Sequence, residues 1–304
     1  MDTPQGIHFA TIDVGSNAVR LMIASVKLFN EELFIKKMNL VRLPIRLGED
    51  VFNDGEIHKA KRKAIVHAMK GFRSIMKAYE VEGYMACATS AFRDASNGGE
   101  IIKEIKESTG IKLEIINGKQ EASYIFEAGL QEKLHKKHNY LYVDVGGGST
   151  ELTLLIDGKR KMAESFQIGT VRFLQGKVKK EEWQRLFEWL DENASGEVID
   201  GVIGSGGNIS KLQKLSTGKR REYLSRTDLD KIYKNLKELS YEERMVKFFL
   251  KHDRADVIVP AAEIFLRIMN HLDAEEILVP RLGLTDGLLV HLINDYLEKM
   301  KSSK

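Results

Sequence analysis

Short apolar runs and amphipathic stretches alternate along the chain and divide it into strands and helices. Apolar runs bounded by turn residues predict strands. These runs fall at 7–26 (a strand pair), 34–43, 84–88, 113–116, 140–145, 152–156, 161–166, 198–203 and 276–279. Apolar residues recurring every three or four positions predict helices. These fall at 57–79, 99–108, 120–133, 181–191, from 209 onward, in two pieces across 226–249, at 257–271 and at 284–299. Mixed strands followed by alternating strands and helices are typical of an α/β fold.

Two short segments are near copies of each other. Residues 12–21 read Ile-Asp-Val-Gly-Ser-Asn-Ala-Val-Arg-Leu, and residues 143–152 read Val-Asp-Val-Gly-Gly-Gly-Ser-Thr-Glu-Leu. Each is an apolar strand that ends in Asp, then a tight turn, then a second apolar strand. When the two are aligned, Arg20 matches Glu151. The repeat predicts a duplicated domain whose two turns face each other across a cleft.

The two turns carry the residue types that a phosphate site needs. Glycine lets backbone N–H groups converge on an anion, and hydroxyl or amide side chains add donors. An Asp beside such a loop can hold a hydrated divalent cation. The alternative is that the glycines only satisfy hairpin geometry. The loop residues predicted to bind phosphate are Gly15, Ser16, Asn17, Gly146, Gly147, Gly148, Ser149 and Thr150.

Length and composition limit the class of protein. A chain of 304 residues favours two domains, placed here at 1–123 and 124–304. Lys plus Arg (47) nearly balances Asp plus Glu (44), so the net charge says nothing about partners, and no nucleic-acid partner is expected. No apolar stretch has the length of a membrane span. The single cysteine, Cys87, lies in an apolar run, and the first residues show no secretion signal. A cytoplasmic location with no membrane partner is therefore expected.

Three charged side chains lie where they could act on phosphate. Glu121 is in the first turn of a predicted helix, where it could orient a water for attack on phosphorus. From position alone it is better explained by the favourable charge of an acidic residue at a helix N-terminus. Arg93 follows a strand and a Thr-Ser-Ala turn, and Arg20 lies on the second strand of the first hairpin. Either could bind phosphoryl oxygens in bidentate fashion, although a single arginine in such a position is more often the partner of a surface salt bridge.

Other motifs are weaker. Residues 204–209 resemble a dinucleotide-binding turn, but the last required glycine is Ile209. The segments 135–138 and 252–253 contain histidines that are better explained by a solvated helix end and by coincidence than by metal binding. A basic cluster after the 204–208 turn could attract a polyanion or could be a solvated face. Its members are Lys211, Lys214, Lys219, Arg220 and Arg221.

Taken together, these motifs resemble the exopolyphosphatase / guanosine pentaphosphate phosphohydrolase (Ppx/GppA) family of the actin-like ATPase superfamily. The resemblance covers almost the whole chain. Its motifs, in order, are the segments 12–21, 88–97, 118–122, 144–151, 168–172 and 204–208. It implies an α/β fold of two ribonuclease-H-like domains with an interdomain active-site cleft, in the short two-domain form. The last helix, about 286–300, would pack back on the first domain.

The resemblance also implies roles for single residues. Glu121 would be the catalytic base that positions the water, with Mg²⁺ as the cofactor. Arg20 and Arg93 would bind phosphate, as would Gly206 and Gly207 of the third glycine-rich turn. Asp13, Asp144 and Glu151 would be the carboxylates on the magnesium side.

The chain departs from the family pattern at three positions. The glutamate that usually precedes the catalytic one is Gln120, and Asn208 replaces a usual threonine. Thr285 stands where the family typically places an arginine, and Arg281 is the candidate to replace it.

The function implied is an exopolyphosphatase that removes the terminal phosphate of inorganic polyphosphate. Hydrolysis of guanosine pentaphosphate to the tetraphosphate by the same machinery is the alternative. A weakly catalytic sensor of guanosine tetraphosphate or polyphosphate is a reading from another class, motivated by Thr285 and Gln120. An actin-like kinase is a third, which the Glu121 segment disfavours. The resemblance also allows the chain to form a homodimer.

Overall fold

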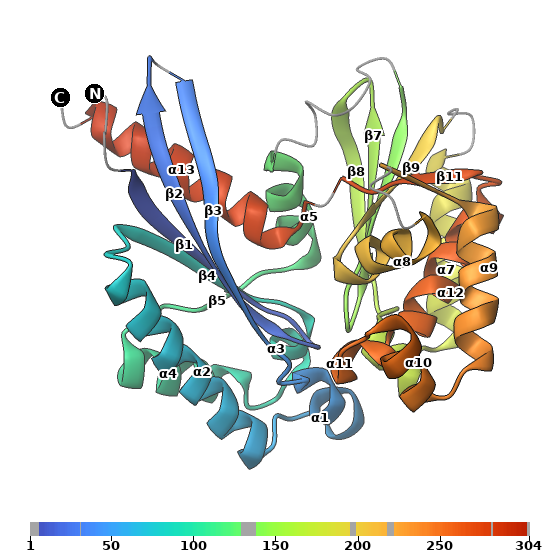
Figure 1. Ribbon diagram of the computed structural model, residues 1–304, viewed down its shortest axis with the longest axis horizontal. Coiled ribbons are helices and arrows are strands. Elements are labelled where there is room, and N and C mark those ends of the chain that lie inside the picture. Colours follow the sequence, from blue (N-terminus) through green and yellow to red (C-terminus); the bar gives the residue numbers. More distant parts are fainter. Residues whose placement is uncertain are drawn as a thin grey trace. The chain divides into compact units, whose positions relative to one another are not determined.

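The chain folds into two compact units. The computed structural model describes residues 6–30, 32–128, 138–194, 199–217, 222–280 and 282–302 (Figure 1). The first unit comprises residues 1–128 and 284–304, and the second comprises residues 129–283. The predicted boundary between residues 123 and 124 lies inside a continuous helix, α5 (Gly118–Glu127), and the division falls after that helix.

The first unit is a five-stranded mixed sheet with helices. Its sheet has the order β3-β2-β1-β4-β5, with β1–β2 and β2–β3 antiparallel and β1–β4 and β4–β5 parallel. The strands are β1 (Ile7–Val14), β2 (Val19–Phe29), β3 (Glu32–Leu43), β4 (Gly83–Ala88) and β5 (Glu114–Ile115). The helices besides α5 are α1 (Leu47–Asp54), α2 (Lys59–Ala78), α3 (Ser90–Asp94), α4 (Gly98–Thr109) and α13 (Leu284–Ser302). The last six residues of β1 are all buried, as expected for a central strand.

The second unit contains a six-stranded mixed sheet of order β10-β11-β9-β6-β7-β8. The strands are β6 (Tyr140–Val145), β7 (Thr150–Ile156), β8 (Lys159–Phe166), β9 (Gly201–Ser205), β10 (Tyr223–Ser225) and β11 (Glu276–Leu278). The helices are α6 (Thr170–Leu174), α7 (Lys180–Ala194), α8 (Gly207–Thr217), α9 (Arg226–Glu238), α10 (Tyr241–Phe248), α11 (His252–Ala255) and α12 (Ile258–His271). Its buried core contains residues of α7, α8, α9 and α12 together with residues of the sheet.

The two sheets follow one plan. In each, an antiparallel three-stranded meander (β1–β2–β3 or β6–β7–β8) is joined through its first strand to a parallel strand (β4 or β9). A short helix follows the third strand in each unit, α1 after β3 and α6 after β8. The order of strands confirms the duplication that the repeated hairpin predicted.

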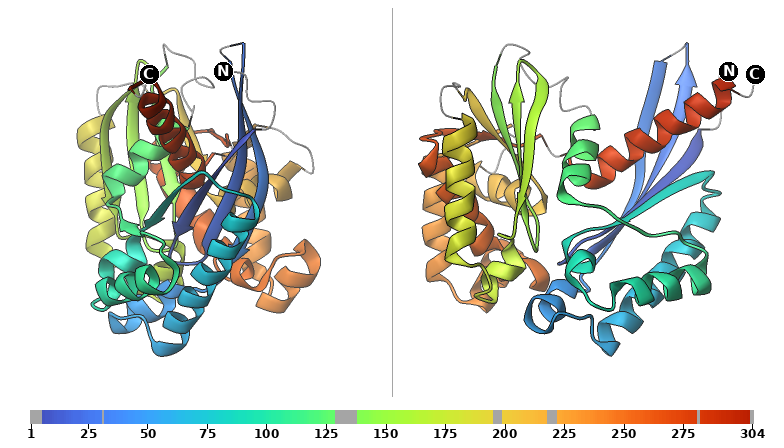
Figure 2. Two further views of the ribbon diagram at one scale, coloured as in Figure 1. Left: turned by 90° about the vertical axis from the view of Figure 1, so that its left-hand side faces the viewer. Right: turned by 180° about the vertical axis from the view of Figure 1, so that it is seen from behind.

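The last helix packs on the first unit, and both views of Figure 2 show this arrangement. Leu289 and Ile293 of α13 lie in a buried cluster with Phe9 of β1 and Met22 of β2. Helix α13 also crosses α5 at Gly287, where an added Cβ would lie 1.8 Å from the Tyr124 carbonyl oxygen. A glycine is therefore required at this crossing.

The predicted strands and long helices all have counterparts, but the short elements α1, α3, α6, α11 and β10 were not predicted. They are three to eight residues long, too short for a helical or strand period to stand out from the surrounding sequence. The predicted helix 120–133 is seen up to Glu127, and its last part lies outside the described residues.

Candidate active site

The first hairpin places an ion pair at the end of its strands. Asp13 on β1 lies directly opposite Arg20 on β2, and the Arg20 Nη1–Asp13 Oδ2 distance is 2.5 Å. Asp13 is buried, whereas the Arg20 side chain is about one-third exposed. The turn is closed by the Gly15 N–H, which donates to the Ala18 carbonyl at 3.1 Å. A guanidinium here neutralises the buried carboxylate and keeps one edge in solvent.

The second hairpin has the same register but two carboxylates. Asp144 on β6 lies opposite Glu151 on β7, and both are buried. The Gly146 N–H donates to the Ser149 carbonyl at 2.9 Å, the equivalent of the bond in the first turn. Glu151 Oε1 accepts hydrogen bonds from the hydroxyls of Ser149 (2.6 Å) and Ser165 (3.0 Å). These two bonds orient the Glu151 carboxylate within the sheet.

The start of α6 holds the glycine loop of the second unit by its carbonyls. The Thr170 N–H donates to the Gly146 carbonyl at 3.0 Å, and the Val171 N–H donates to the Gly147 carbonyl at 2.8 Å. Arg172 Nε donates to the Gly148 carbonyl at 2.9 Å. In a trans peptide the C=O and the next N–H point in opposite directions. The N–H groups of Gly147, Gly148 and Ser149 therefore point away from α6, as an anion-binding loop requires.

The loop of the first unit is held in the same way. The Gly48 N–H donates to the Ser16 carbonyl at 2.8 Å, and the Arg46 N–H donates to the Asn17 carbonyl at 3.0 Å. The hydroxyls of Ser16 and Ser90 share a buried hydrogen bond of 2.7 Å. This second bond ties the loop to the start of α3, the helix that carries Arg93.

Arg93 and Glu121 lie close together in the first unit. Arg93 Nη1 donates to the Ile116 carbonyl at 2.7 Å and lies 3.7 Å from Glu121 Oε2. The Glu121 side chain is only 12% exposed. The structure thus brings these two predicted site residues into one group, with Arg93 fixed by a backbone carbonyl and facing the carboxylate.

Gln120 caps the helix that carries Glu121. The Asn117 side chain accepts a hydrogen bond from the Gln120 N–H, and the Gln120 side chain accepts one from the Asn117 N–H, both at 2.9 Å. This capping box satisfies two N–H groups at the start of α5. Its effect is to fix the first turn, in which Glu121 lies. The departure at Gln120 therefore has a structural role.

The third glycine-rich turn lies beside Asp144. Ser205 on β9 is the register partner of Asp144 on β6, and Gly206 has a φ of 101°. A Cβ at Gly206 would lie 3.3 Å from Asp144 Oδ1, so this turn approaches the carboxylate closely. The Ser205 hydroxyl donates to the Leu282 carbonyl at 2.9 Å.

Basic side chains gather near the start of α8, which follows this turn. A Cβ at Gly207 would lie 3.0 Å from Arg254 Nη2. Lys211 Nζ donates to the Phe248 carbonyl at 3.1 Å. Burial, together with the positive charges of Arg254 and Lys214, lowers the pKa of Lys211. The first two members of the predicted basic cluster are thus close to a further arginine, while Lys219, Arg220 and Arg221 lie outside the described residues.

A magnesium site fits the second hairpin. Within the described ranges no group of three or more His, Cys, Asp or Glu side chains comes together as a metal site. Mg²⁺ is usually held by one or two carboxylates, with substrate phosphates and water completing its shell. The pair Asp144 and Glu151 matches this donor set, whereas Asp13 is engaged by Arg20.

Thr285, which stands where the family typically places an arginine, and its neighbour Asp286 both make contacts within the first unit. The Thr285 carbonyl accepts a hydrogen bond from the Thr11 hydroxyl at 3.1 Å. Asp286 forms an ion pair with Lys37 on β3. Arg281, the candidate replacement, lies outside the described residues.

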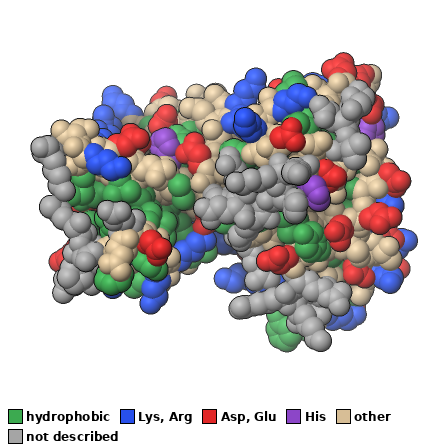
Figure 3. Space-filling view, turned by 90° about the horizontal axis from the view of Figure 1, so that it is seen from above, with side chains coloured by type: hydrophobic (Ala, Val, Ile, Leu, Met, Phe, Trp, Pro, Cys, Tyr) green, Lys and Arg blue, Asp and Glu red, His purple; other side chains and the backbone are tan. Residues whose placement is uncertain are grey.

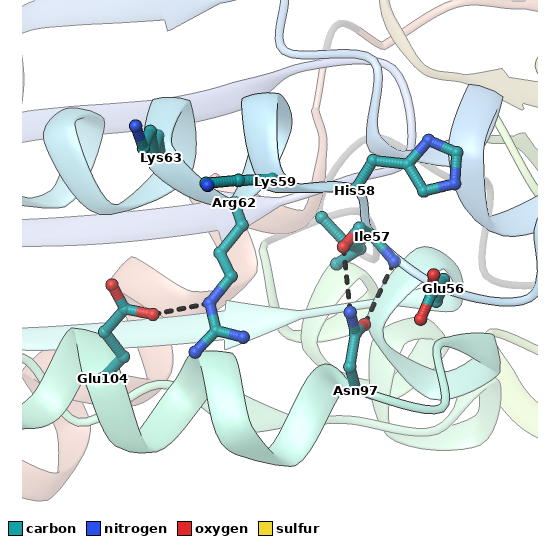
Figure 4. Close-up of a pocket in the computed structure, with 8 residues that line it drawn as sticks. All are labelled: Glu56, Ile57, His58, Lys59, Arg62, Lys63, Asn97 and Glu104. Carbon is teal, nitrogen blue, oxygen red and sulfur yellow. Dashed lines mark hydrogen bonds and ion pairs between the residues drawn. The ribbon is translucent and has the colours of Figure 1, made fainter.

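Other candidates make contacts of their own. His252 contacts the Tyr241 hydroxyl through Nδ1. A pocket of about 610 Å³ opens between α2 and α4 (Figure 4), and none of the predicted site residues lines it. Within it Asn97 binds the N–H and C=O of Ile57, and Arg62 pairs with Glu104. Asn97, part of the second family-like motif, therefore ties the loop before α2 to α4.

Sequence reasoning assigned no role to the residues that hold the two loops. Arg172 and Gly48 make long-range bonds that have no local signature, although Arg172 lies in one of the family-like motifs. The position of each after the third strand of its meander is the only signal that could have pointed to them. No helix in the described part of the chain is long and apolar enough to cross a membrane.

Comparisons with known proteins agree with the fold. The sequence profile of the Ppx/GppA phosphatase family matches residues 30–295. A bifunctional 3-dehydroquinate synthase/phosphatase of Fusobacterium nucleatum is 31% identical over 89% of this chain, which spans 44% of that relative's length. Exopolyphosphatase 1 of Mycobacterium tuberculosis is 23% identical over 95% of this chain and 89% of its own.

Solved structures give the same result. The crystal structure of the Aquifex aeolicus Ppx/GppA family member has a TM-score of 0.74 at 27% identity, covering 96% of this chain and 98% of its own. An exopolyphosphatase from Cytophaga hutchinsonii has a TM-score of 0.80 at 24% identity, covering 93% and 96%. The predicted α/β fold of two ribonuclease-H-like domains is thereby confirmed.

Proposed function

Because the chain belongs to the Ppx/GppA phosphatase family, we propose that it hydrolyses the terminal phosphoanhydride bond of inorganic polyphosphate. The names of the mycobacterial relatives support this substrate. The observation that carries the proposal is the glycine loop whose Gly147, Gly148 and Ser149 N–H groups point away from α6. Such a loop binds an anion without a side-chain cation.

Glu121 orients the attacking water in this proposal. Its carboxylate is almost fully buried, and the guanidinium of Arg93 lies 3.7 Å away. A positioned carboxylate can accept the proton of a water as the water attacks phosphorus in line. Arg93 faces the Glu121 carboxylate and holds it in place, and Arg20 and the loop residues bind phosphoryl oxygens.

When bound at Asp144 and Glu151, Mg²⁺ would neutralise negative charge on the phosphates. Ser149 and Ser165 keep the Glu151 carboxylate turned to one orientation. Gly206 leaves space beside Asp144, where any side chain would crowd its Oδ1.

The basic group at α8 favours an extended polyanion as substrate. Burial lowers the pKa of Lys211, and repulsion from the positive charges of Arg254 and Lys214 lowers it further. An anion bound among them relieves that repulsion. A chain of phosphates extends beyond the reacting group and can reach such charges, which is why we place polyphosphate before guanosine pentaphosphate.

The test is phosphate release from long-chain polyphosphate and, in parallel, from guanosine pentaphosphate, with Mg²⁺ present. Glu121→Gln is expected to lower kcat by about 10²–10⁴-fold while polyphosphate still binds. Glu127→Gln is the matched control, since Glu127 lies on the same helix and pairs with His291 at the surface. It is expected to leave the rate unchanged.

Each outcome discriminates among functions. Release from polyphosphate that is lost in Glu121→Gln supports the proposal. Release from guanosine pentaphosphate alone assigns the chain to the alternative hydrolase. Tight binding of either compound without release identifies a sensor, and an unimpaired Glu121→Gln variant rejects Glu121 as the base.

A further inference from the structure

Exposed apolar side chains are concentrated on the hairpin β2–β3 of the first unit. Six large apolar residues on this hairpin are exposed, and the fractions range from 39% to 59%. They are Phe29, Leu33, Phe34, Ile35, Met38 and Leu40. Figure 3 shows hydrophobic side chains gathered on one face of this unit, at the left of that view. Patches of this kind mark interaction surfaces.

The corresponding strand of the second unit is different. Both β3 and β8 are edge strands of their sheets. Strand β8 begins with Lys159, Arg160 and Lys161, and Met162 is its only large apolar side chain that is exposed among the described residues. Charges on an edge strand prevent pairing with another chain. The first half of β3 lacks this protection over residues 33–35, where three apolar side chains follow one another.

We propose that β3 pairs with β3 of a second copy of this chain, antiparallel, with Phe34 opposite Phe34 of the second copy. In that register Leu33 lies opposite Ile35, and Glu32 lies opposite Lys36, each pair occurring twice because of the two-fold symmetry. The partner is thus a second copy, and the interface is a sheet continued across two protomers.

Charge and side-chain direction both select this register. Glu32, Phe34 and Lys36 alternate onto one face of the sheet, where they are partnered on β2 by Phe29, Lys27 and Ser25. The same alternation puts Leu33 and Ile35 on the opposite face, so every proposed pair lies on one face. Glu32 and Lys36 take part in no ion pair with any other described residue. The dimer therefore matches opposite charges and matches apolar with apolar side chains.

The position of the bulge limits the paired segment. The β2–β3 register shifts between Ile23 and Ala24, where Met38 has no partner on β2. Residues 32–36 lie wholly within the regular part of β3. Beyond Met38 the strand twists more strongly, so the proposed ladder ends before it.

A groove beside β3 enlarges the surface. A stable interface buries about 800 Å² per partner, more than a ladder of five residues, about 17 Å long, provides. A groove of about 220 Å³ adjoins Leu33 and is lined on α13 by Tyr296, Leu297 and Met300. The Ile35 side chain of the second copy, opposite Leu33, lies at this groove and adds apolar contact to the ladder.

Sedimentation velocity on the full chain tests the charge pairs. Wild type is expected to dimerise with rising concentration. Glu32→Lys, which faces Lys36, and Lys36→Glu, which faces Glu32, are each expected to weaken dimerisation about tenfold or more. The double variant Glu32→Lys/Lys36→Glu restores opposite charges and is expected to dimerise like wild type. Circular dichroism and thermal unfolding check that each variant is folded.

A cross-linking measurement tests the central pair. Phe34→Cys is expected to form an intermolecular disulfide under mild oxidation, because the two copies of residue 34 face each other. Met162→Cys on β8 is the matched control and is expected to stay reduced. Cys87 is buried and does not interfere.

The outcomes decide the proposal without reference to hydrolysis. A wild type that stays monomeric at high micromolar concentration overturns it, and so does a dimer that the single charge reversals leave unchanged. A monomer that co-sediments with anionic lipid vesicles through the same residues also overturns it and assigns the patch to a membrane surface. Weakening by each reversal with rescue by the double variant supports it.

Discussion

The two hairpins share a backbone and differ in charge. In both, a strand ends in Asp, the first glycine N–H donates to the carbonyl three residues on, and the following helix holds the loop by its carbonyls. In the first hairpin the residue opposite Asp13 is Arg20, which neutralises it. In the second hairpin the residue opposite Asp144 is Glu151. The duplicated scaffold thus fixes where donors point, while one cross-strand position sets the local charge.

That difference gives the halves different chemistry. Like charges directly opposite on two strands are destabilising, so a buried pair of carboxylates is best satisfied by a bound cation. A neutralised Asp–Arg pair has no such need, and the exposed edge of its guanidinium can bind an anion. We therefore expect metal dependence to follow the second hairpin, whereas the guanidinium that binds phosphate comes from Arg20 of the first.

The largest effect expected from this comparison is on metal dependence. Glu151→Gln removes one of the two carboxylate ligands and is expected to raise the Mg²⁺ concentration for half-maximal phosphate release by about a hundredfold. Arg20→Gln is expected to raise KM and to change the Mg²⁺ requirement by less than about twofold. Titration of activity with Mg²⁺ at saturating substrate measures the metal requirement of both variants, and titration with substrate at saturating Mg²⁺ measures KM.

Glu164→Gln controls for loss of charge near the same sheet. Glu164 lies on β8, one residue from Ser165, and pairs with Arg185 at the surface. Its substitution is expected to leave the Mg²⁺ titration unchanged. If Arg20→Gln shifted the metal requirement and Glu151→Gln did not, the assignment of the two hairpins would have to be exchanged.

The next effect concerns the segments that hold the loops. A Cβ at Gly169 would lie 2.3–2.5 Å from backbone atoms of Gly147 and Gly148, whereas one at Gly48 meets mainly the movable ring of Phe52. Gly169→Ala is therefore expected to lower the free energy of unfolding by about 3 kcal/mol, and Gly48→Ala by about 1 kcal/mol. Urea unfolding measures both.

Gly71→Ala serves as the reference for this pair. Gly71 lies inside α2 with open space around its Cβ position, so alanine there is expected to stabilise the protein by about 0.5–1 kcal/mol. An equal fall in the free energy of unfolding in Gly169→Ala and Gly48→Ala would contradict this prediction. It would mean that a Cβ is tolerated equally well at the two positions, although only the one at Gly169 meets backbone atoms at 2.3–2.5 Å.

The same two segments explain where sequence reasoning was sufficient and where it was not. Buried strands such as β1 and β6 are mostly apolar, and the repeated Asp-x-Gly hairpins can be recognised from the sequence. Helices α1 and α6 are short, and their importance comes from bonds to loops that precede them by more than 20 residues. Such contacts have no local period or motif, so only the fold reveals them.

Gln120 is a case in which the sequence contained a usable signal. The spacing Asn117-x-x-Gln120 is that of a capping box, and both of its hydrogen bonds are present. Comparison with a family pattern directed attention to the missing glutamate, while local helix chemistry accounts for the glutamine. That the named site residues surround the substrate remains a prediction.

A smaller effect is expected from the side chain that holds the second loop. Arg172→Gln removes the bond from Nε to the Gly148 carbonyl, and we expect KM to rise about tenfold with little change in kcat, since the loop binds phosphate equally before and during reaction. In the first unit the bond comes from the Arg46 N–H, and the Arg46 side chain pairs with Glu49. Arg46→Gln is accordingly expected to leave KM within about twofold, and an equal rise in both variants would contradict the difference.

The smallest effect follows from the parallel strand beside each hairpin. Cys87 is the register partner of Asp13, as Ser205 is of Asp144. Burial, with the charges of Glu114, Asp13 and Glu121, raises the pKa of Cys87 from 9.0 to about 12. Below pH 8 the thiol is protonated in both folded and unfolded chains, so it adds no pH dependence. Above pH 9 only the unfolded chain loses the proton.

The free energy of unfolding should therefore fall with rising pH by about 1.4 kcal/mol per pH unit from this thiol, between pH 9 and its folded pKa. Cys87→Ser copies the residue of the second unit and removes that slope. Urea unfolding from pH 7 to pH 10, compared between the two proteins, isolates the thiol from the lysines and tyrosines that titrate in the same range. Parallel pH profiles would show that the thiol ionises as readily in the folded chain as in the unfolded one, and that the carboxylates around Cys87 do not act on it.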